Sequence, residues 1–108
     1  MSSKLHKGND KNIDNLIEQG TLTIVKYGAT WCGPCKMIAP ILEELSDAYG
    51  SVTFVDVDID DEEASDSTAK NEVTMVPTVI FYKNGKEVDR FVGFRPKEDI
   101  EAMIKKYY

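Results

Sequence analysis

The sequence lacks any apolar run that approaches the roughly 20 residues a membrane-spanning helix needs. Residues 1–10 also lack the apolar centre of a signal peptide. Cysteine and histidine are scarce, with two Cys and one His in 108 residues. Two cysteines three positions apart cannot form a disulfide framework that links distant segments of a secreted fold. We therefore expect a cytoplasmic protein with no membrane contact.

Positive charge is also in short supply, because 13 Lys and Arg face 19 Asp and Glu, a formal net charge of −6. Seven of the acidic residues lie within residues 56–66, a stretch that contains no Lys or Arg. A chain without a broad basic surface cannot neutralise many phosphates or anionic lipids. We expect no nucleic-acid partner and no membrane partner.

Length and composition fit one globular domain. The chain is 42% hydrophobic and 30% charged, and about 100 residues are enough for one ordinary hydrophobic core but too few for two. We assign residues 1–108 to a single domain and expect a monomer. Residues 1–9 are expected to form a weak edge strand or a partly flexible segment.

Apolar periodicity predicts strands and helices in alternation. Helices are expected over residues 12–19, 34–49 and about 61–72, and from residue 96 on; strands are expected over 22–27, 52–59, 79–82 and 87–92, with a doubtful one over 4–6. Asn84-Gly85, between the last two strands, is typical of a type I′ hairpin. The order predicts an α/β fold, a three-layer α/β/α arrangement whose central mixed sheet joins a parallel βαβ unit to a C-terminal antiparallel hairpin.

Each of the expected helices has an assignable apolar face. It consists of Ile13, Leu16 and Ile17 in the first helix, and of Ile100, Met103, Ile104 and Tyr107 in the last one. In the helix that begins near Pro34, the apolar positions are Met37, Ile38, Ile41, Leu42, Leu45 and Tyr49. In the helix that follows the acidic run, the weakly apolar face consists of Ala64, Thr68 and Ala69.

The two cysteines lie where the first central strand turns into a helix. In an α/β sheet this edge, at the carboxyl ends of the parallel strands, is where chemistry is usually found. Unpaired N–H groups and the helix dipole at that helix start would stabilise a thiolate on Cys32, and the thiolate is the form that attacks disulfides. Cys35, one turn further on, can close a small ring with it. The spacing thus predicts Cys32 as an exposed nucleophile and Cys35 as a buried resolving thiol.

Two metal-binding interpretations compete with this chemistry. Zinc needs four ligands, and beyond the two sulfurs the chain offers only His6, which we expect at the surface. The run Asp56-x-Asp58-x-Asp60 imitates the start of a calcium loop, but Asp61 stands at its sixth place instead of Gly and Ser67 at its twelfth instead of Glu. A strand end and helix cap in solvent explains these acids better.

One long motif and three shorter ones indicate a known protein family. The long motif is Ala29-Thr30-Trp31-Cys32-Gly33-Pro34-Cys35-Lys36-Met37-Ile38-Ala39-Pro40, and the shorter ones are Val76-Pro77-Thr78, Lys83-Asn84-Gly85-Lys86 and Gly93. In these motifs the chain closely resembles the thioredoxin family. The resemblance extends over about residues 10–108. It implies that Pro77 is cis and faces the dithiol, and that Val76 offers backbone hydrogen bonds to an extended substrate segment. It further implies a substrate-docking surface formed by Trp31, Gly33, Pro34, Val76, Pro77 and Gly93.

The chain departs from the family at Lys26, where a buried Asp usually precedes the motif on the first central strand. Asp56, on the next strand, stands where many members have a Lys. A charge on a strand buried on both faces needs a partner. We therefore expect Lys26 and Asp56 to form an ion pair beneath the dithiol that tunes its acidity. In the alternative, the Lys26 stem packs in the core and its ammonium reaches water far from either sulfur.

The resemblance implies a protein-disulfide reductase that uses Cys32 and Cys35, requires no bound cofactor or metal, and takes part in electron transport and cell redox homeostasis. Its implied partners are disulfide-containing protein substrates and thioredoxin reductase, an NADPH-dependent flavoprotein. A disulfide oxidase or isomerase would differ by redox poise rather than by fold. A non-catalytic adaptor that merely retains the cysteines is the third interpretation.

Overall fold

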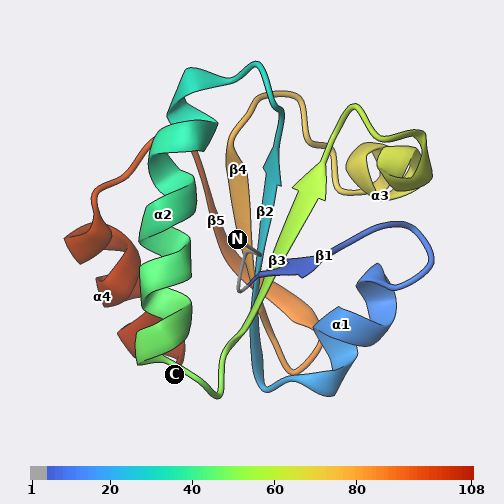
Figure 1. Cartoon of the computed structure of the whole chain (residues 1–108). Coiled ribbons are helices and arrows are strands. Elements are labelled where there is room, and N and C mark those ends of the chain that lie inside the picture. Colours follow the sequence, from blue (N-terminus) through green and yellow to red (C-terminus); the bar gives the residue numbers. More distant parts are fainter. Residues whose placement is uncertain (1–4) are drawn as a thin grey trace.

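The protein is built on one five-stranded mixed sheet (Figure 1). The structure is a computed structural model that describes residues 5–108. The strand order is β1-β3-β2-β4-β5, with the strands spanning β1 His6–Lys7, β2 Leu22–Gly28, β3 Thr53–Asp58, β4 Thr78–Lys83 and β5 Lys86–Val92. The helices are α1 Ile13–Gln19, α2 Gly33–Ala48, α3 Ser65–Lys70 and α4 Lys97–Tyr107, with a 3₁₀ turn over Glu62–Ala64.

Strand β2 is the centre of the sheet, and every one of its residues is buried. It pairs in parallel with β3 and antiparallel with β4. A strand covered on both faces should be a continuous apolar run rather than an alternating one, and residues 22–27 have that pattern except at Thr23 and Lys26. The predicted parallel βαβ unit and C-terminal hairpin are both confirmed.

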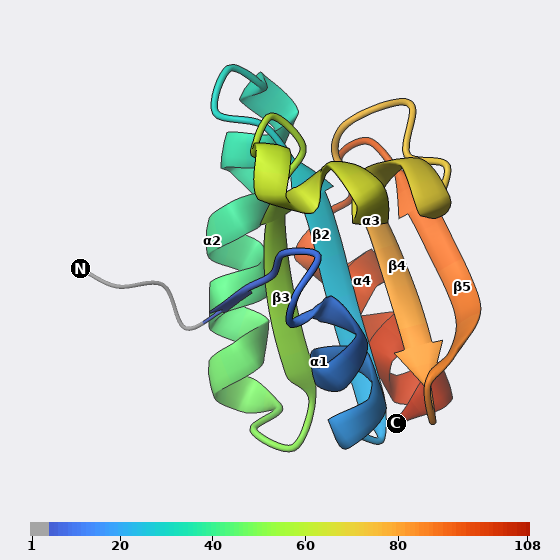
Figure 2. The ribbon, with the colours of Figure 1, turned by 90° about the vertical axis from the view of Figure 1, so that its right-hand side faces the viewer.

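Helices cover both faces of the sheet, α2 and α4 on one side and α1 and α3 on the other (Figures 1 and 2). Two buried clusters correspond to these two faces. Ile38 and Leu42 of α2 and Ile100 of α4 belong to one cluster. Leu16 of α1 and Ala64 of the 3₁₀ turn belong to the other. The expected three-layer α/β/α architecture is confirmed.

The hairpin between β4 and β5 has the predicted turn. Asn84 and Gly85 have φ of 53° and 84°, and positive φ at both central positions is the mark of type I′. The ladder shifts register between Phe81 and Tyr82. The turn matches the strand twist, so the hairpin needs only two residues to reverse the chain.

The segment after β3 differs from the prediction made from the sequence. The single helix expected over residues 61–72 is a 3₁₀ turn followed by the six-residue α3. The carboxylate of Asp61 caps the turn by accepting a hydrogen bond from the Glu63 N–H at 2.9 Å. Ser67 is buried in place of the expected Ala69, which is exposed, because Ser67 contacts the Tyr27 hydroxyl.

Met37 lies away from the core, and the doubtful edge strand is present. Met37, expected on the buried face of α2, is 58% exposed, because the helix turns this position away from the sheet near its start. The doubtful edge strand exists as β1, which pairs in parallel with β3; Lys4 lies outside the described residues. None of the described helices is long and apolar enough to cross a membrane.

Candidate active site

The two cysteines occupy the junction between β2 and α2. Cys32 is the N-cap of α2, and its sulfur accepts a hydrogen bond from the backbone N–H of Cys35 at 3.1 Å. The two residues form a disulfide, with Cα atoms 5.3 Å apart. Pro34 stands in the first turn of the helix, where the N–H that proline lacks would have no helical partner. The helix start therefore presents its donor groups to the sulfur of Cys32.

Burial differs from the expectation that Cys32 would be exposed. Cys32 is 4% and Cys35 is 2% exposed, so in this disulfide state the exposure of the two residues hardly differs. The cause is a small apolar cluster in which Ala29, Ile59 and Val76 pack around the pair. The two sulfurs differ instead in their position on the helix, because only Cys32 is the N-cap of α2.

A loop before β4 lies against the disulfide. The Val76–Pro77 peptide bond is cis, as the resemblance implied, and the Val76 carbonyl oxygen lies 3.7 Å from the sulfur of Cys32. The Thr78 hydroxyl donates to the Met75 carbonyl at 2.6 Å. The Gly93 N–H donates to the Pro77 carbonyl at 2.8 Å. The first of these bonds is local to the loop, and the second joins the loop to the residue that follows β5, so residues 32, 76, 77 and 93 lie at one end of the sheet.

Trp31 is held at the edge of this site by an acidic residue. Its side chain is 66% exposed, and its indole Nε1 donates to Asp60 Oδ2 at 2.7 Å. Asp60 belongs to the acidic run, and its own N–H donates to Asp58 Oδ1 at 2.9 Å. From the sequence, Asp60 is expected to be a solvated acid, so its hydrogen bond to Trp31 was not predicted. The signal was available, since the two residues follow neighbouring parallel strands whose carboxyl ends meet.

Exposed apolar side chains gather in the same segments. Met37 and Met75 are 58% and 64% exposed, and Phe94 is 42% exposed. Gly33 and Pro34 are exposed as well. Met75 and Phe94 were not predicted as site residues, although each adjoins a residue that was. These exposed side chains belong to the segments that carry the cysteines, the cis-proline loop and Gly93.

Lys26 and Asp56 form the expected ion pair on the other side of the cysteines. Lys26 Nζ lies 3.4 Å from Asp56 Oδ1, with the two side chains 9% and 47% exposed. The alternative, an ammonium that reaches water far from the site, is wrong, because the Lys26 side chain is almost wholly enclosed. Lys26, Asp56 and Cys35 line the same cavity of about 350 Å³.

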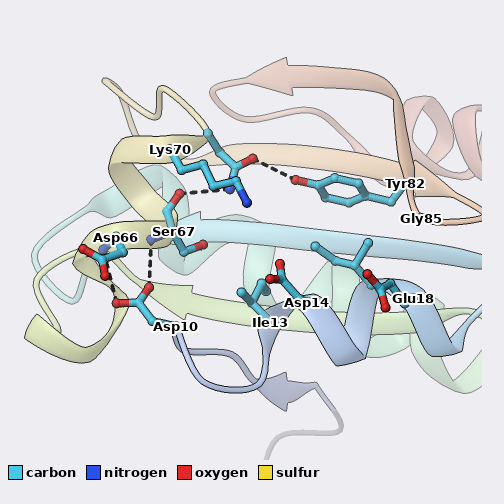
Figure 3. Close-up of a pocket in the computed structure, with 11 residues that line it drawn as sticks. Asp10, Ile13, Asp14, Glu18, Asp66, Ser67, Lys70, Tyr82 and Gly85 are labelled. Carbon is cyan, nitrogen blue, oxygen red and sulfur yellow. Dashed lines mark hydrogen bonds between the residues drawn. The ribbon is translucent and has the colours of Figure 1, made fainter.

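A second cavity, of about 440 Å³, lies on the other face of the sheet and contains neither cysteine (Figure 3). The carboxylate of Asp10 accepts hydrogen bonds from the N–H groups of Asp66 and Ser67 at 3.2 and 2.8 Å. The Tyr82 hydroxyl donates to Asn71 Oδ1 at 3.2 Å, and burial raises the pKa of this phenol. This network anchors α3 to the rest of the molecule, and no part of it reaches the disulfide.

Among residues 5–108, no three carboxylate, thiol or imidazole groups are arranged to hold a metal ion. His6 is exposed, as expected. The reactive groups described at this site are the two sulfurs. A redox-active cysteine pair at a helix N-terminus, opposite a cis-proline loop, defines a thiol–disulfide oxidoreductase.

Comparisons with known proteins agree with this class. The family model described as Thioredoxin matches residues 4–106. A thioredoxin from Staphylococcus saprophyticus is 46% identical over 102 residues, which cover 94% of this chain and 95% of the relative. The chain belongs to the thioredoxin family and is a protein-disulfide oxidoreductase.

Solved structures are similar over nearly the whole chain. A Plasmodium falciparum thioredoxin has a TM-score of 0.87 at 39% identity, with 96% of this chain and 100% of that one covered. The oxidised mitochondrial thioredoxin 3 of Saccharomyces cerevisiae has a TM-score of 0.84 at 37% identity, with 94% of each chain covered.

Proposed function

We propose that the protein reduces disulfides of other proteins, with Cys32 as nucleophile and Cys35 as resolving thiol. The observation that carries the assignment is the place of Cys32 at the N-cap of α2, where its sulfur accepts the Cys35 N–H. A helix N-terminus stabilises a negative charge, so the reduced protein holds its reactive thiolate at Cys32. Cys35, one turn inside the helix, is the thiol that such a nucleophile needs for resolution.

The reaction proceeds in two exchanges. The Cys32 thiolate attacks one sulfur of the substrate disulfide, forms a mixed disulfide and releases the other substrate sulfur as a thiolate, which takes up a proton. Cys35, deprotonated, then attacks the Cys32 sulfur, and the second substrate sulfur departs and is protonated. Two electrons and two protons pass to the substrate, and the Cys32–Cys35 disulfide remains.

The proposed docking surface for the substrate consists of Trp31, Gly33, Pro34, Val76, Pro77 and Gly93. Their support is the clustering of exposed Trp31, Gly33 and Pro34 with the loop that contacts Cys32. The backbone of Val76 would pair with an extended segment, a mode that recognises shape more than sequence. The exposed Met75 and Phe94, next in sequence to Val76 and Gly93, would add apolar area to this surface.

The proposed electron donor is a thioredoxin reductase, a flavoprotein that draws on NADPH, and the proposed setting is the cytoplasm, with the protein acting as a monomer. A reduction potential of the Cys32–Cys35 couple that is near or below the reduction potential of the cytosolic glutathione pool supports a reductase. A potential far above it would assign the protein to the disulfide oxidases.

An insulin-reduction assay with dithiothreitol as electron source tests the activity. The wild-type protein should accelerate precipitation of the insulin B chain, and Cys32→Ser should not. No acceleration by the wild type would make the protein an adaptor that merely retains its cysteines.

Trapping tests the two roles separately. Cys35→Ser should accumulate mixed disulfides with substrate proteins, because the first exchange proceeds and the second cannot. Accumulation by Cys32→Ser, with none by Cys35→Ser, would reverse the assignment of nucleophile and resolving thiol.

A further inference from the structure

A row of alternating charge crosses three strands on the side of the sheet next to Cys35. Asp56 of β3 is in register with Lys7 of β1 on one side and with Lys26 of β2 on the other. Residues in register on neighbouring strands point to the same face of a sheet. The Asp56 carboxylate thus has a lysine on each flank, and it lies 3.4 Å from the ammonium of Lys26.

Gly28 brings the inner end of this row close to the resolving cysteine. A Cβ placed on Gly28 would lie 2.9 Å from Lys26 Cε and 3.3 Å from the sulfur of Cys35. Both atoms thus occupy the space that a side chain at residue 28 would take. Lys26 Cε and the Cys35 sulfur are therefore no more than about 6 Å apart, and the ammonium nitrogen is one bond beyond that carbon. A charge at such short range changes the acidity of a neighbouring group.

The charges around this point are more positive than negative. The cavity next to Cys35 is lined by three lysines, one each from β1, β2 and α2, and by two aspartates from β3: Lys7, Lys26, Lys36, Asp56 and Asp58. Asp58 already accepts the backbone N–H of Asp60. Lys26 is the one of the three lysines that is buried, so water screens its field least.

We propose that Lys26 is a positioning residue for the second exchange: its ammonium, held by Asp56, stabilises the thiolate of Cys35. The proposal rests on the proposed function, since it concerns the resolving role of Cys35. In the mixed disulfide, Cys35 must lose its proton to solvent before its sulfur attacks Cys32. A buried cation beside Cys35 increases the fraction of thiolate at a given pH. The site is tuned by a fixed charge and needs no carboxylate base at residue 26.

The titration of Cys35 tests the proposal directly. In a Cys32→Ser background the chain has one thiol, so ultraviolet thiolate absorbance against pH reports on Cys35 alone. Lys26→Met keeps most of the stem and removes the charge, and it should raise the pKa of Cys35 by on the order of one pH unit. Lys26→Arg keeps the charge and should restore most of the effect.

Two further variants separate a local field from other causes. Lys105→Met makes the same change in net charge on the exposed last turn of α4, and it should leave the titration unchanged. Asp56→Asn, at a half-exposed position, removes the carboxylate and leaves the cation, so it should lower the pKa of Cys35. Where Lys26→Met does not fold, Lys26→Gln removes the same charge with a neutral polar side chain and should also raise the pKa of Cys35.

The kinetic consequence is smaller than the change in acidity. A rise of one pH unit leaves about tenfold less thiolate below the pKa, but the more basic thiolate is about threefold more nucleophilic, so resolution should slow about threefold. In the protein that retains both cysteines, the rate at which a thiol is released from a preformed mixed disulfide on Cys32 measures this step.

Superimposable titrations of the Lys26→Met variant and its parent would overturn the proposal, as would equal shifts in Lys26→Met and Lys105→Met. Asp56→Asn without a downward shift would also overturn it. None of these results depends on insulin reduction. Failure of the proposed function therefore remains distinguishable from failure of this inference.

Discussion

At the scale of single residues, the site depends on which side chains are small. Gly28 is buried at the carboxyl end of β2, and the absence of its side chain lets the Lys26 stem and the Cys35 sulfur share one space. Gly33, between the cysteines, has nothing within 4 Å of a Cβ placed on it. The two glycines near this disulfide therefore differ, because a side chain at residue 28 would collide with Lys26 and Cys35 and one at residue 33 would meet no neighbour within 4 Å.

Gly28→Ala should move the ammonium of Lys26 away from Cys35. The added methyl group would lie 2.9 Å from Lys26 Cε, the far end of a flexible side chain, which yields more easily than the Cys35 sulfur at 3.3 Å. In the Cys32→Ser background, we expect the pKa of Cys35 to rise, by less than in Lys26→Met. We also expect a loss of about 1–3 kcal/mol in the free energy of unfolding, as is usual for overpacking. An unchanged thiol titration would show that Lys26 is not the group that yields.

At the scale of elements, the ends of strands and helices determine where the reactive groups lie. The carboxyl end of β2 leads into α2, and the carboxyl end of β3 leads into the acidic run that holds Trp31 through Asp60. At the opposite end, the hairpin between β4 and β5 contributes no residue to the site. It sets the register of β5, whose following residue Gly93 bonds to the carbonyl of Pro77.

Gly85→Ala should therefore destabilise the fold without touching the disulfide. Gly85 has φ of 84°, and its Cβ would meet only Glu18 Cγ at 3.9 Å, so the cost is conformational. An alanine in the left-handed region costs about 1–2 kcal/mol, which urea denaturation can measure as a lower midpoint.

Gly50→Ala is the matched control for this variant. Its Cβ would have no neighbour within 4 Å and its φ lies outside the left-handed region, so it should be neutral or slightly stabilising. Equal midpoints for the two variants would contradict the assignment of strain to Gly85.

At the scale of the whole molecule, two cores on opposite faces of one sheet give the dithiol a rigid support. The core under α2 and α4 contains Leu42, which is 1% exposed. Leu42 lies on the same helix as Cys35 and Met37, so burial of its inner face fixes the helix whose first turn carries the chemistry.

Leu42→Ala should lower the free energy of unfolding by about 2–5 kcal/mol, since it removes buried groups and leaves a cavity. Met37→Ala, on the exposed side of the same helix, should change it by no more than about 0.5 kcal/mol. Urea unfolding followed by circular dichroism compares the two. Similar losses for both would mean that α2 is not supported mainly through its inner face.

The sequence by itself determined the order of elements, the hairpin turn and the chemistry of the cysteine pair. Each of these depends on neighbours along the chain: the apolar period, positive φ at Asn84-Gly85, and two sulfurs one helical turn apart. The expected pairing of Lys26 with Asp56 came from counting along two strands of a recognisable fold, and the parallel register confirmed it.

Only the tertiary structure decided the burial of Cys32, the exposure of Met37, the bond between Trp31 and Asp60, and the space at Gly28 that Lys26 shares with Cys35. Local patterns can predict which face of an element is apolar, but whether that face is covered depends on segments distant along the chain. Val76 lies 44 residues after Cys32 and Asp60 lies 29 after Trp31. The physical reason is that exposure and side-chain contacts arise from packing between layers, which no single segment contains.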